Sequence, residues 1–158
     1  GVYFAMKVPM TKMPEMVAIF NGVGGLASVG IAASDFWRRS FELSTEVPLI
    51  TGVSIVAGIF IGGVTFTGSY IAFAKLNGSI SGKSIQFGGQ HLLNLLLILG
   101  VVVFGALMLM YPDQIFFLVA TSILSLVLGV LLVIPIGGAD MPVVISLLNS
   151  YSGIAGCA

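Results

Sequence analysis

Charged residues are scarce in this chain of 158 residues, and their scarcity excludes an ordinary soluble domain. Lys, Arg, Asp and Glu together make up 8% of the sequence, whereas about a quarter is usual in soluble domains. Hydrophobic residues make up 58%, so too few charges remain to cover a water-exposed surface. The formal net charge is zero, which gives no support to nucleic-acid binding. The composition indicates a protein whose solvent is a lipid bilayer.

Cysteine and titratable groups are almost absent as well. Cys157 is the single cysteine, which excludes an intrachain disulfide and a metal site built on cysteines, and we interpret it as a small packing residue. No acidic residue falls near the middle of a long apolar run. His91, the one side chain with an ordinary pKa near neutrality, falls at the start of such a run, beside a loop. The chain itself therefore shows no obvious titrating group at bilayer depth.

Long apolar runs dominate what is present. A membrane-spanning helix needs roughly 20 apolar residues, and the runs here do not alternate as strands would. Gly1 to Met6 resembles the last turns of a helix, so we expect a piece of a larger membrane protein. The sequence predicts an all-α membrane protein, a bundle of about five transmembrane helices plus the end of a preceding helix. The expected helices cover residues 13–33, 47–74, 92–111, 114–134 and 141–158.

The few charges gather in the connections between these runs. Lys7 and Lys12 precede or begin the first run, and Lys75 and Lys83 fall in the third connection. Both arginines fall in the second connection, beside acids. With five spans, the first, third and fifth connections share one side of the membrane. Because an excess of Lys and Arg marks the cytoplasmic side, this side, which includes Asp140, is expected to be cytoplasmic.

Small and polar residues recur at helical spacing within the runs. In the run 47–74, six residues follow at steps of three or four and share one helix face: Thr51, Ser54, Gly58, Gly62, Thr65 and Ser69. Such faces let helix backbones approach closely in lipid. Ser and Thr can also donate to the carbonyl four residues earlier in their own helix. Close packing is the simpler interpretation for most of these residues.

Asparagine is harder to explain by packing alone. Asn21, Asn94 and Asn149 fall in, or at the edge of, the expected spans. An asparagine amide cannot be fully satisfied by its own helix, and an unpaired buried polar group costs on the order of a few kcal/mol. Two interpretations stay open, namely hydrogen bonds that hold helices together and a polar, water-bridged path across the bundle.

Two nucleotide-binding motifs are matched only superficially. GVGGLA at 22–27 fits G-x-G-x-x-A, but no strand precedes it and it lies within an expected span. SGKS at 81–84 resembles the end of a phosphate-binding loop, but its upstream glycine, Gly78, is one residue too close. We therefore expect no cofactor to be bound by this chain, and we identify in it no catalytic residue and no metal ligand.

Four blocks of sequence, in the same order, are similar to the membrane domain of the beta subunit of proton-translocating NAD(P) transhydrogenase. The blocks are MPEMVA at 13–18, GIFIGGVTFTGS at 58–69, GGADMPVV at 137–144 and LNSYSG at 148–153. The resemblance implies that 1–158 is part of a transmembrane proton-channel domain. It also implies an enzyme, a transhydrogenase that couples inward proton translocation to hydride transfer from NADH to NADP⁺. NAD(H) and NADP(H) would bind in extramembranous domains of the complete enzyme.

The resemblance also implies roles for individual residues. Asn149 matches the polar residue that the family places on the proton path, and Ser69 matches a position whose small polar character matters. Asp140 matches the acid of the coupling loop that faces the NADP(H) domain. From these matches and the polar faces we expect a proton path formed by Asn149, Asn21, Ser69, Thr65 and Ser146.

One departure from the family pattern concerns Asn21. Many members carry a histidine at this position, and the resemblance implies that here the proton-path histidine comes from an alpha-type partner subunit. That subunit would also supply the NAD(H) domain and further helices. The other expected partners are the NADP(H) domain of the beta subunit, the lipid bilayer and a second copy of the complete enzyme, without nucleic acid. The expected location is the bacterial cytoplasmic (inner) membrane, which the chain crosses several times.

Two other classes of protein remain as alternatives. The chain could be a helix-bundle fragment of a secondary transporter or channel that binds a small solute, or a purely structural bundle. Transporters tend to show internal repeats and helices broken near the middle of the membrane, and the sequence displays neither. A structural bundle would tolerate replacement of Asn149 by an apolar residue.

Overall fold

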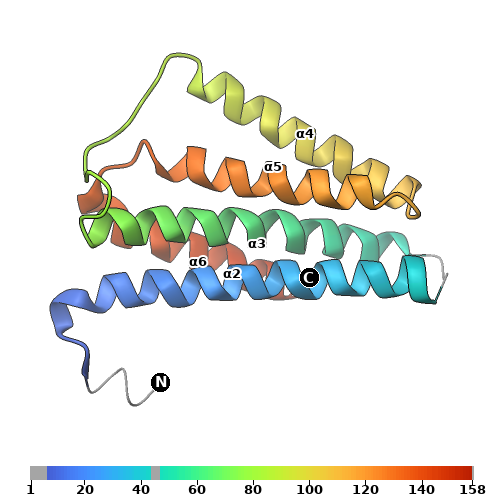
Figure 1. The fold of residues 1–158 in the computed structure, drawn as a ribbon, viewed down its shortest axis with the longest axis horizontal. Coiled ribbons are helices and arrows are strands. Elements are labelled where there is room, and N and C mark those ends of the chain that lie inside the picture. The colour runs from blue at the N-terminus through green and yellow to red at the C-terminus, as the bar shows by residue number, and fades with distance from the viewer. Residues whose placement is uncertain (1–6, 44–46, 158) are drawn as a thin grey trace.

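The computed structural model describes residues 7–43 and 47–157, and within them it consists of helices and connections without strands (Figure 1). The prediction of an all-α bundle with five long helices is confirmed. The helices are α2 (Met13–Trp37), α3 (Leu49–Leu76), α4 (Gln90–Met110), α5 (Ile115–Val133) and α6 (Met141–Cys157). The end of a preceding helix, expected over residues 1–6, lies outside the described residues.

Three short elements flank the long helices. The 3₁₀ turn η1 (Met10–Lys12) precedes α2, and the π-helical turn η2 (Arg38–Glu42) continues it. The 3₁₀ turn η3 (Gly138–Asp140) leads into α6. Pro14 is accommodated in the first turn of α2, where a backbone N–H has no helical partner to lose.

The first helix is longer than the expected range 13–33. Its backbone continues past Ala33 to Trp37 and then into η2, because charged residues end an apolar run without breaking a helix. Arg39 donates to the Asp35 carboxylate at 2.9 Å, an i,i+4 pair that bridges the last turn of α2 and η2. At the other helices the observed ends lie within two residues of the expected ones. Gly89, with φ of 84°, precedes α4 in a left-handed conformation that suits glycine.

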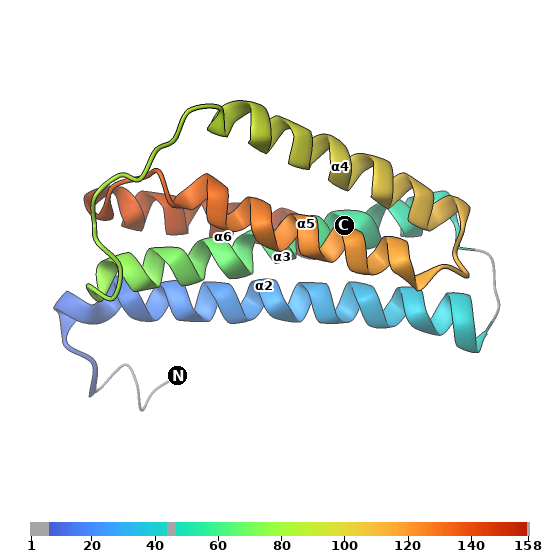
Figure 2. The ribbon, with the colours of Figure 1, turned by 45° about the horizontal axis from the view of Figure 1, so that its top comes forward.

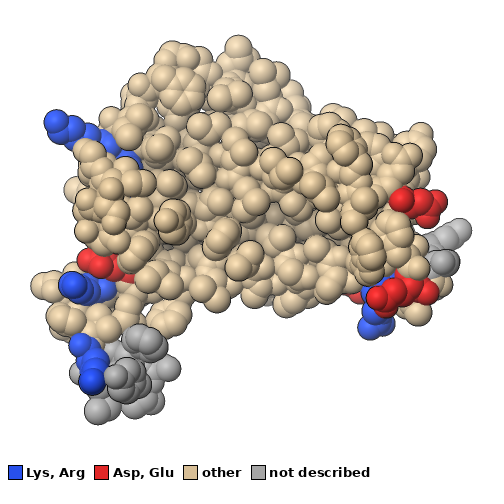
Figure 3. Space-filling view, viewed as in Figure 1, with Lys and Arg blue, Asp and Glu red and all other residues tan. Residues whose placement is uncertain are grey.

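Among the described residues, four segments are long and apolar enough to cross a membrane: Met10–Glu42, Leu49–Leu76, Gln90–Met110 and Ile115–Val133. The expected fifth span, α6, has 17 described residues, which reach only about 25 Å against a hydrocarbon core of about 30 Å. On the face that Figure 3 shows, charged side chains lie at the two ends of the bundle and an uncharged surface separates them. The chain is a membrane protein with several apolar helices.

The central helix of the bundle is α3. It packs against α2, α5 and α6, whereas α4 lies at the edge and packs mainly against α5 (Figures 1 and 2). One buried apolar cluster joins α3, α5 and α6 around Ala72, Leu128 and Met141. A second cluster joins α2, α3 and α4 at the opposite end, around Phe36 and Ile59.

Glycine determines how closely α2 and α3 approach. A Cβ atom added to Gly25 would lie 2.7 Å from the carbonyl oxygen of Gly62, and one added to Gly62 would lie 2.7 Å from the carbonyl oxygen of Gly25. Neither position has room for a methyl group, because the nearest atom in each case is a backbone oxygen of the facing helix. The close packing expected for the small-residue face of α3 is therefore observed.

Candidate functional site

The first element of the site is a hydrogen bond between α2 and α3. Asn21 Nδ2 donates to Ser69 Oγ at 2.8 Å, and these side chains are 7% and 0% exposed. Gly22 lies against the same serine, since a Cβ added to it would be 3.4 Å from Ser69 Cβ. An asparagine amide offers two donors and an acceptor, so one bond leaves it capacity for further partners.

The second element is a groove of about 460 Å³ between α2 and α6. On the α6 side, Ser146 and Asn149 stand one turn apart on a single face. Asn21 lies on the opposite wall, so amides from two helices border one cavity. The remaining lining residues are Val17, Phe20, Gly24, Pro142, Ile145 and Ser152. Asn149 and Ser146 are exposed along this groove, which opens on the surface that the described residues form.

The third element is Thr65, one turn before Ser69 on α3. Its side chain is fully buried, and its Oγ1 has no hydrogen-bond partner among the described residues. It does not line the groove. It lies beneath Gly25, whose added Cβ would be 3.0 Å from Thr65 Cβ. A buried hydroxyl without a partner is uncommon in a folded protein and needs an explanation, such as a bound water.

The structure thus brings together four of the five residues expected on the proton path. Asn21 and Ser69 are bonded, and Asn21 shares its groove with Ser146 and Asn149. Asp140, the expected coupling residue, is exposed at the end of the bundle and does not line the groove. It closes η3, and the groove begins two residues later at Pro142.

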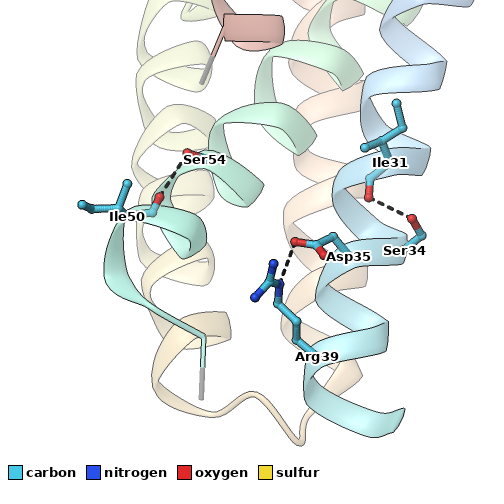
Figure 4. Close-up of polar contacts among 6 residues, drawn as sticks. All are labelled: Ile31, Ser34, Asp35, Arg39, Ile50 and Ser54. Carbon is cyan, nitrogen blue, oxygen red and sulfur yellow. Dashed lines mark hydrogen bonds and ion pairs between the residues drawn. The ribbon is translucent and has the colours of Figure 1, made fainter. Parts of the chain in front are cut away.

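The opposite end of α2 and α3 carries a second, wider cavity of about 930 Å³. Three of its polar side chains form bonds close to their own position in the sequence (Figure 4). Ser34 Oγ donates to the Ile31 carbonyl at 2.9 Å, and Ser54 Oγ donates to the Ile50 carbonyl at 3.0 Å. Asp35 is paired with Arg39 within the same helical stretch, and such partly exposed pairs contribute little to stability. These three bonds each stay within one continuous helical stretch, unlike the Asn21–Ser69 bond.

Sequence reasoning missed Lys75. The sequence predicts a place for it in a connection, but it lies in the last turn of α3 with a side chain that is 5% exposed. Its Nζ donates to three backbone carbonyls from other parts of the chain. A lysine at the end of an apolar run usually extends its ammonium group into water, so the sequence carried no signal for this burial.

The fold and the groove together define a class of protein. It is a helical membrane domain in which amides and hydroxyls from separate helices meet between the helices. The family model described as NAD(P) transhydrogenase beta subunit matches residues 1–158. The chain therefore belongs to the NAD(P) transhydrogenase beta subunit family.

Two relatives agree with this family. One is an NAD(P) transhydrogenase subunit beta of Rhodospirillum rubrum, which is 43% identical over 158 residues. The match covers 98% of this chain and 34% of the relative. The same protein from a particular strain of Rhodospirillum rubrum gives the same values. The chain thus spans about a third of the length of the relatives that it matches.

Proposed function

We propose that this chain forms the proton-conducting membrane part of NAD(P) transhydrogenase. In the complete enzyme, inward proton movement would be coupled to hydride transfer from NADH to NADP⁺. Family membership supports the enzyme class. The observation that carries the proton path is the buried Asn21–Ser69 bond beside a groove that also holds Asn149 and Ser146.

The polar residues would act by holding water and by stabilising a charged partner. Neither an amide nor a serine hydroxyl ionises near neutral pH, so the proton carrier has to come from another group. A histidine from a helix of the alpha-type subunit, seated between α2 and α6, would fill this role. The Asn149 amide can accept a hydrogen bond from a protonated imidazole through its oxygen. It can donate to a neutral imidazole through its nitrogen, so both states would find a partner.

The proposal also gives a role to the end of the bundle near Asp140. The exposed Asp140 carboxylate would face the NADP(H) domain, and NAD(H) and NADP(H) would bind in the extramembranous domains of the complete enzyme. The excess of lysine at this end favours a cytoplasmic position in a bacterial inner membrane. The alpha-type subunit would supply the NAD(H) domain and further helices, and the complete enzyme would be a dimer.

The test is Asn149→Leu in the complete enzyme, reconstituted in lipid vesicles. We expect assembly to persist and proton uptake per hydride transferred to fall by on the order of tenfold or more, because the groove loses its central amide. Ser150→Leu is the matched control, since Ser150 is exposed beside Asn149, bonds to the Ser146 carbonyl at 3.0 Å and does not line the groove. Normal coupling in Asn149→Leu would rule out the proposed path.

A further inference from the structure

The buried ammonium group of Lys75 joins two connections that are far apart in the sequence. Lys75 Nζ donates to the carbonyl oxygens of Ile134 at 2.6 Å, Ile136 at 2.7 Å and Lys83 at 3.2 Å. The first two belong to the connection between α5 and α6, and the third belongs to the connection between α3 and α4. An ammonium group has three N–H donors, and all three are used.

The charge of Lys75 has no carboxylate partner within ion-pairing distance in residues 7–43 and 47–157. A buried charge without a counter-ion is unfavourable unless strong hydrogen bonds compensate for the lost water. Hydrogen bonds from a charged donor are stronger and more directional than neutral ones. An apolar side chain could fill the same space, so packing alone does not require an ammonium group. What the ammonium group adds is directional hydrogen bonds to both connections.

The same two connections are tied to each other by bonds that do not involve Lys75. The Gly138 N–H donates to the Gly82 carbonyl at 2.8 Å, and Ser84 Oγ donates to the Pro135 carbonyl. These bonds hold the segment that ends at Asp140 against the α3–α4 connection. Lys75 adds the end of α3 to this assembly, so three parts of the chain are fastened together.

Ser69 lies on the same helix as Lys75, six residues earlier, which corresponds to about 9 Å along the axis. A helix transmits a shift along its axis as a nearly rigid element. The hydrogen bond from Asn21 fixes α3 at Ser69, and the three carbonyls fix it at Lys75. The groove is therefore linked to the Asp140 segment by an unbroken series of contacts: the Asn21–Ser69 bond, the end of α3 and the bonds from Lys75.

We propose that Lys75 is a positioning residue that transmits the state of the Asn21–Ser69 contact to the Asp140 segment. The inference rests on the proposed function, since it concerns how the proton path is coupled to the rest of the enzyme. Lys75 itself carries no proton in this role. It sets the position of Ile134 to Asp140 relative to α3, and therefore the position of the carboxylate that would face the NADP(H) domain.

The experiment uses the complete enzyme in phosphatidylethanolamine–phosphatidylglycerol vesicles. The exposed Ala139, next to Asp140, is replaced by Cys in a Cys157→Ser background, and labelling by a water-soluble maleimide is timed with and without an imposed pH gradient. We expect the gradient to change the labelling rate when Lys75 is present. Lys75→Met should abolish this response and lower proton uptake per hydride by on the order of tenfold.

Lys83→Met is the matched control, because its side chain is exposed and only its backbone carbonyl contacts Lys75. It should keep both the gradient response and the coupling. A purely structural Lys75 would alter the labelling rate equally with and without the gradient and leave coupling intact, and that result would overturn the inference. Equal labelling with and without a gradient in the Lys75 enzyme would also overturn it.

Two further variants keep the test decisive if Lys75→Met does not assemble. Lys75→Arg retains the charge and several donors, whereas Lys75→Gln retains two donors without charge. A gradient response kept by Arg and lost by Gln supports the proposal, and any other combination overturns it. Failure of the proposed function is seen separately, as normal coupling in Asn149→Leu.

Discussion

The two sides of α3 are packed alike but differ in where their hydroxyl groups donate. On the α5 side, Thr121 Oγ1 donates to the Phe117 carbonyl at 2.8 Å, and Ser125 Oγ donates to the Thr121 carbonyl at 2.7 Å. Both bonds stay within one helix. Thr67 reaches across, but its acceptor is the backbone carbonyl of Leu126, at 2.8 Å.

On the α2 side, the hydrogen bond joins two side chains from different helices. Asn21 donates to Ser69, and the neighbouring Thr65 hydroxyl has no partner in the described part of the chain. Side chains bonded to each other can exchange partners with water or with a third group more readily than side chains bonded to helix backbone. The two sides of α3 therefore differ in where the hydrogen bond ends, and not in whether small polar residues are present.

Packing itself does not distinguish the two sides. A Cβ added to Gly25 would lie 2.7 Å from a backbone oxygen of α3, and one added to Gly129 of α5 would lie 2.6 Å from the Val64 carbonyl oxygen. Both glycines allow close approach to α3. The two sides can therefore be separated by experiment only if the packing and the polar groups are altered one at a time.

The largest effect is expected from Gly25→Ala, which alters packing alone. The added methyl group meets backbone that cannot rotate away, so we expect a loss of about 1–3 kcal/mol in stability and weaker assembly. Thermal unfolding of the purified complete enzyme measures this. Gly30→Ala on the same helix is the control, because nothing lies within 4 Å of a Cβ there. Equal melting temperatures for the two variants would contradict the tight α2–α3 contact.

Much of the fold could be predicted from the sequence, because a bilayer leaves few solutions for a chain with long apolar runs. The helix positions and the small-residue face of α3 follow from composition and spacing. The extension of α2 past Ala33 was missed, since the end of an apolar run marks the membrane boundary and not the end of a helix.

The site could be predicted only in part. Asn21 and Ser69 stood out as polar residues in expected spans, yet spacing cannot say that they bond to each other across 48 residues. Spacing also could not separate Ser125, which bonds within its own helix, from Ser69. The burial of Lys75 depends on carbonyls contributed by two distant connections, so no local pattern reveals it.

A matched pair of serine substitutions tests the difference between the two sides directly. Ser69 and Ser125 are both fully buried on or against α3. Ser69→Ala leaves the Asn21 amide without its partner, and we expect proton uptake per hydride to fall by on the order of tenfold. Ser125→Ala removes a bond within one helix and should leave uptake within about twofold. Stability should fall by about 0.6 kcal/mol in Ser69→Ala, the average contribution of a hydrogen bond between membrane helices.

Equal uptake in the two serine variants, measured in vesicles with equal amounts of assembled enzyme, would show that the bond between side chains has no special role. The two sides of α3 would then serve the same purpose, which is helix packing. A loss confined to Ser125→Ala would move the candidate path to the α5 side.

The smallest effect, and the most specific, is expected from Thr65→Val. Valine has the same shape, and the hydroxyl that it removes has no partner among the described residues, so stability should stay equal or rise by up to about 1 kcal/mol. If a water binds Thr65 during proton transfer, uptake per hydride should nevertheless fall by about threefold. Thr121→Val is the matched control, since its hydroxyl donates to the Phe117 carbonyl. That variant should lose about 0.5 kcal/mol, the low end of the net contribution of a hydrogen bond, and keep its uptake.

Thr65→Val is thus expected to keep or gain stability and to lose proton uptake. Thr121→Val is expected to lose stability and to keep its uptake. A Thr65 hydroxyl retained only for packing would leave proton uptake unchanged in both variants, although their stabilities would still differ because only the Thr121 hydroxyl is bonded. Thermal unfolding and vesicle uptake on the same preparations separate the cases. A Thr65→Val enzyme that is more stable and still fully coupled would remove Thr65 from the path, while leaving the Asn21–Ser69 bond to be judged by the serine pair.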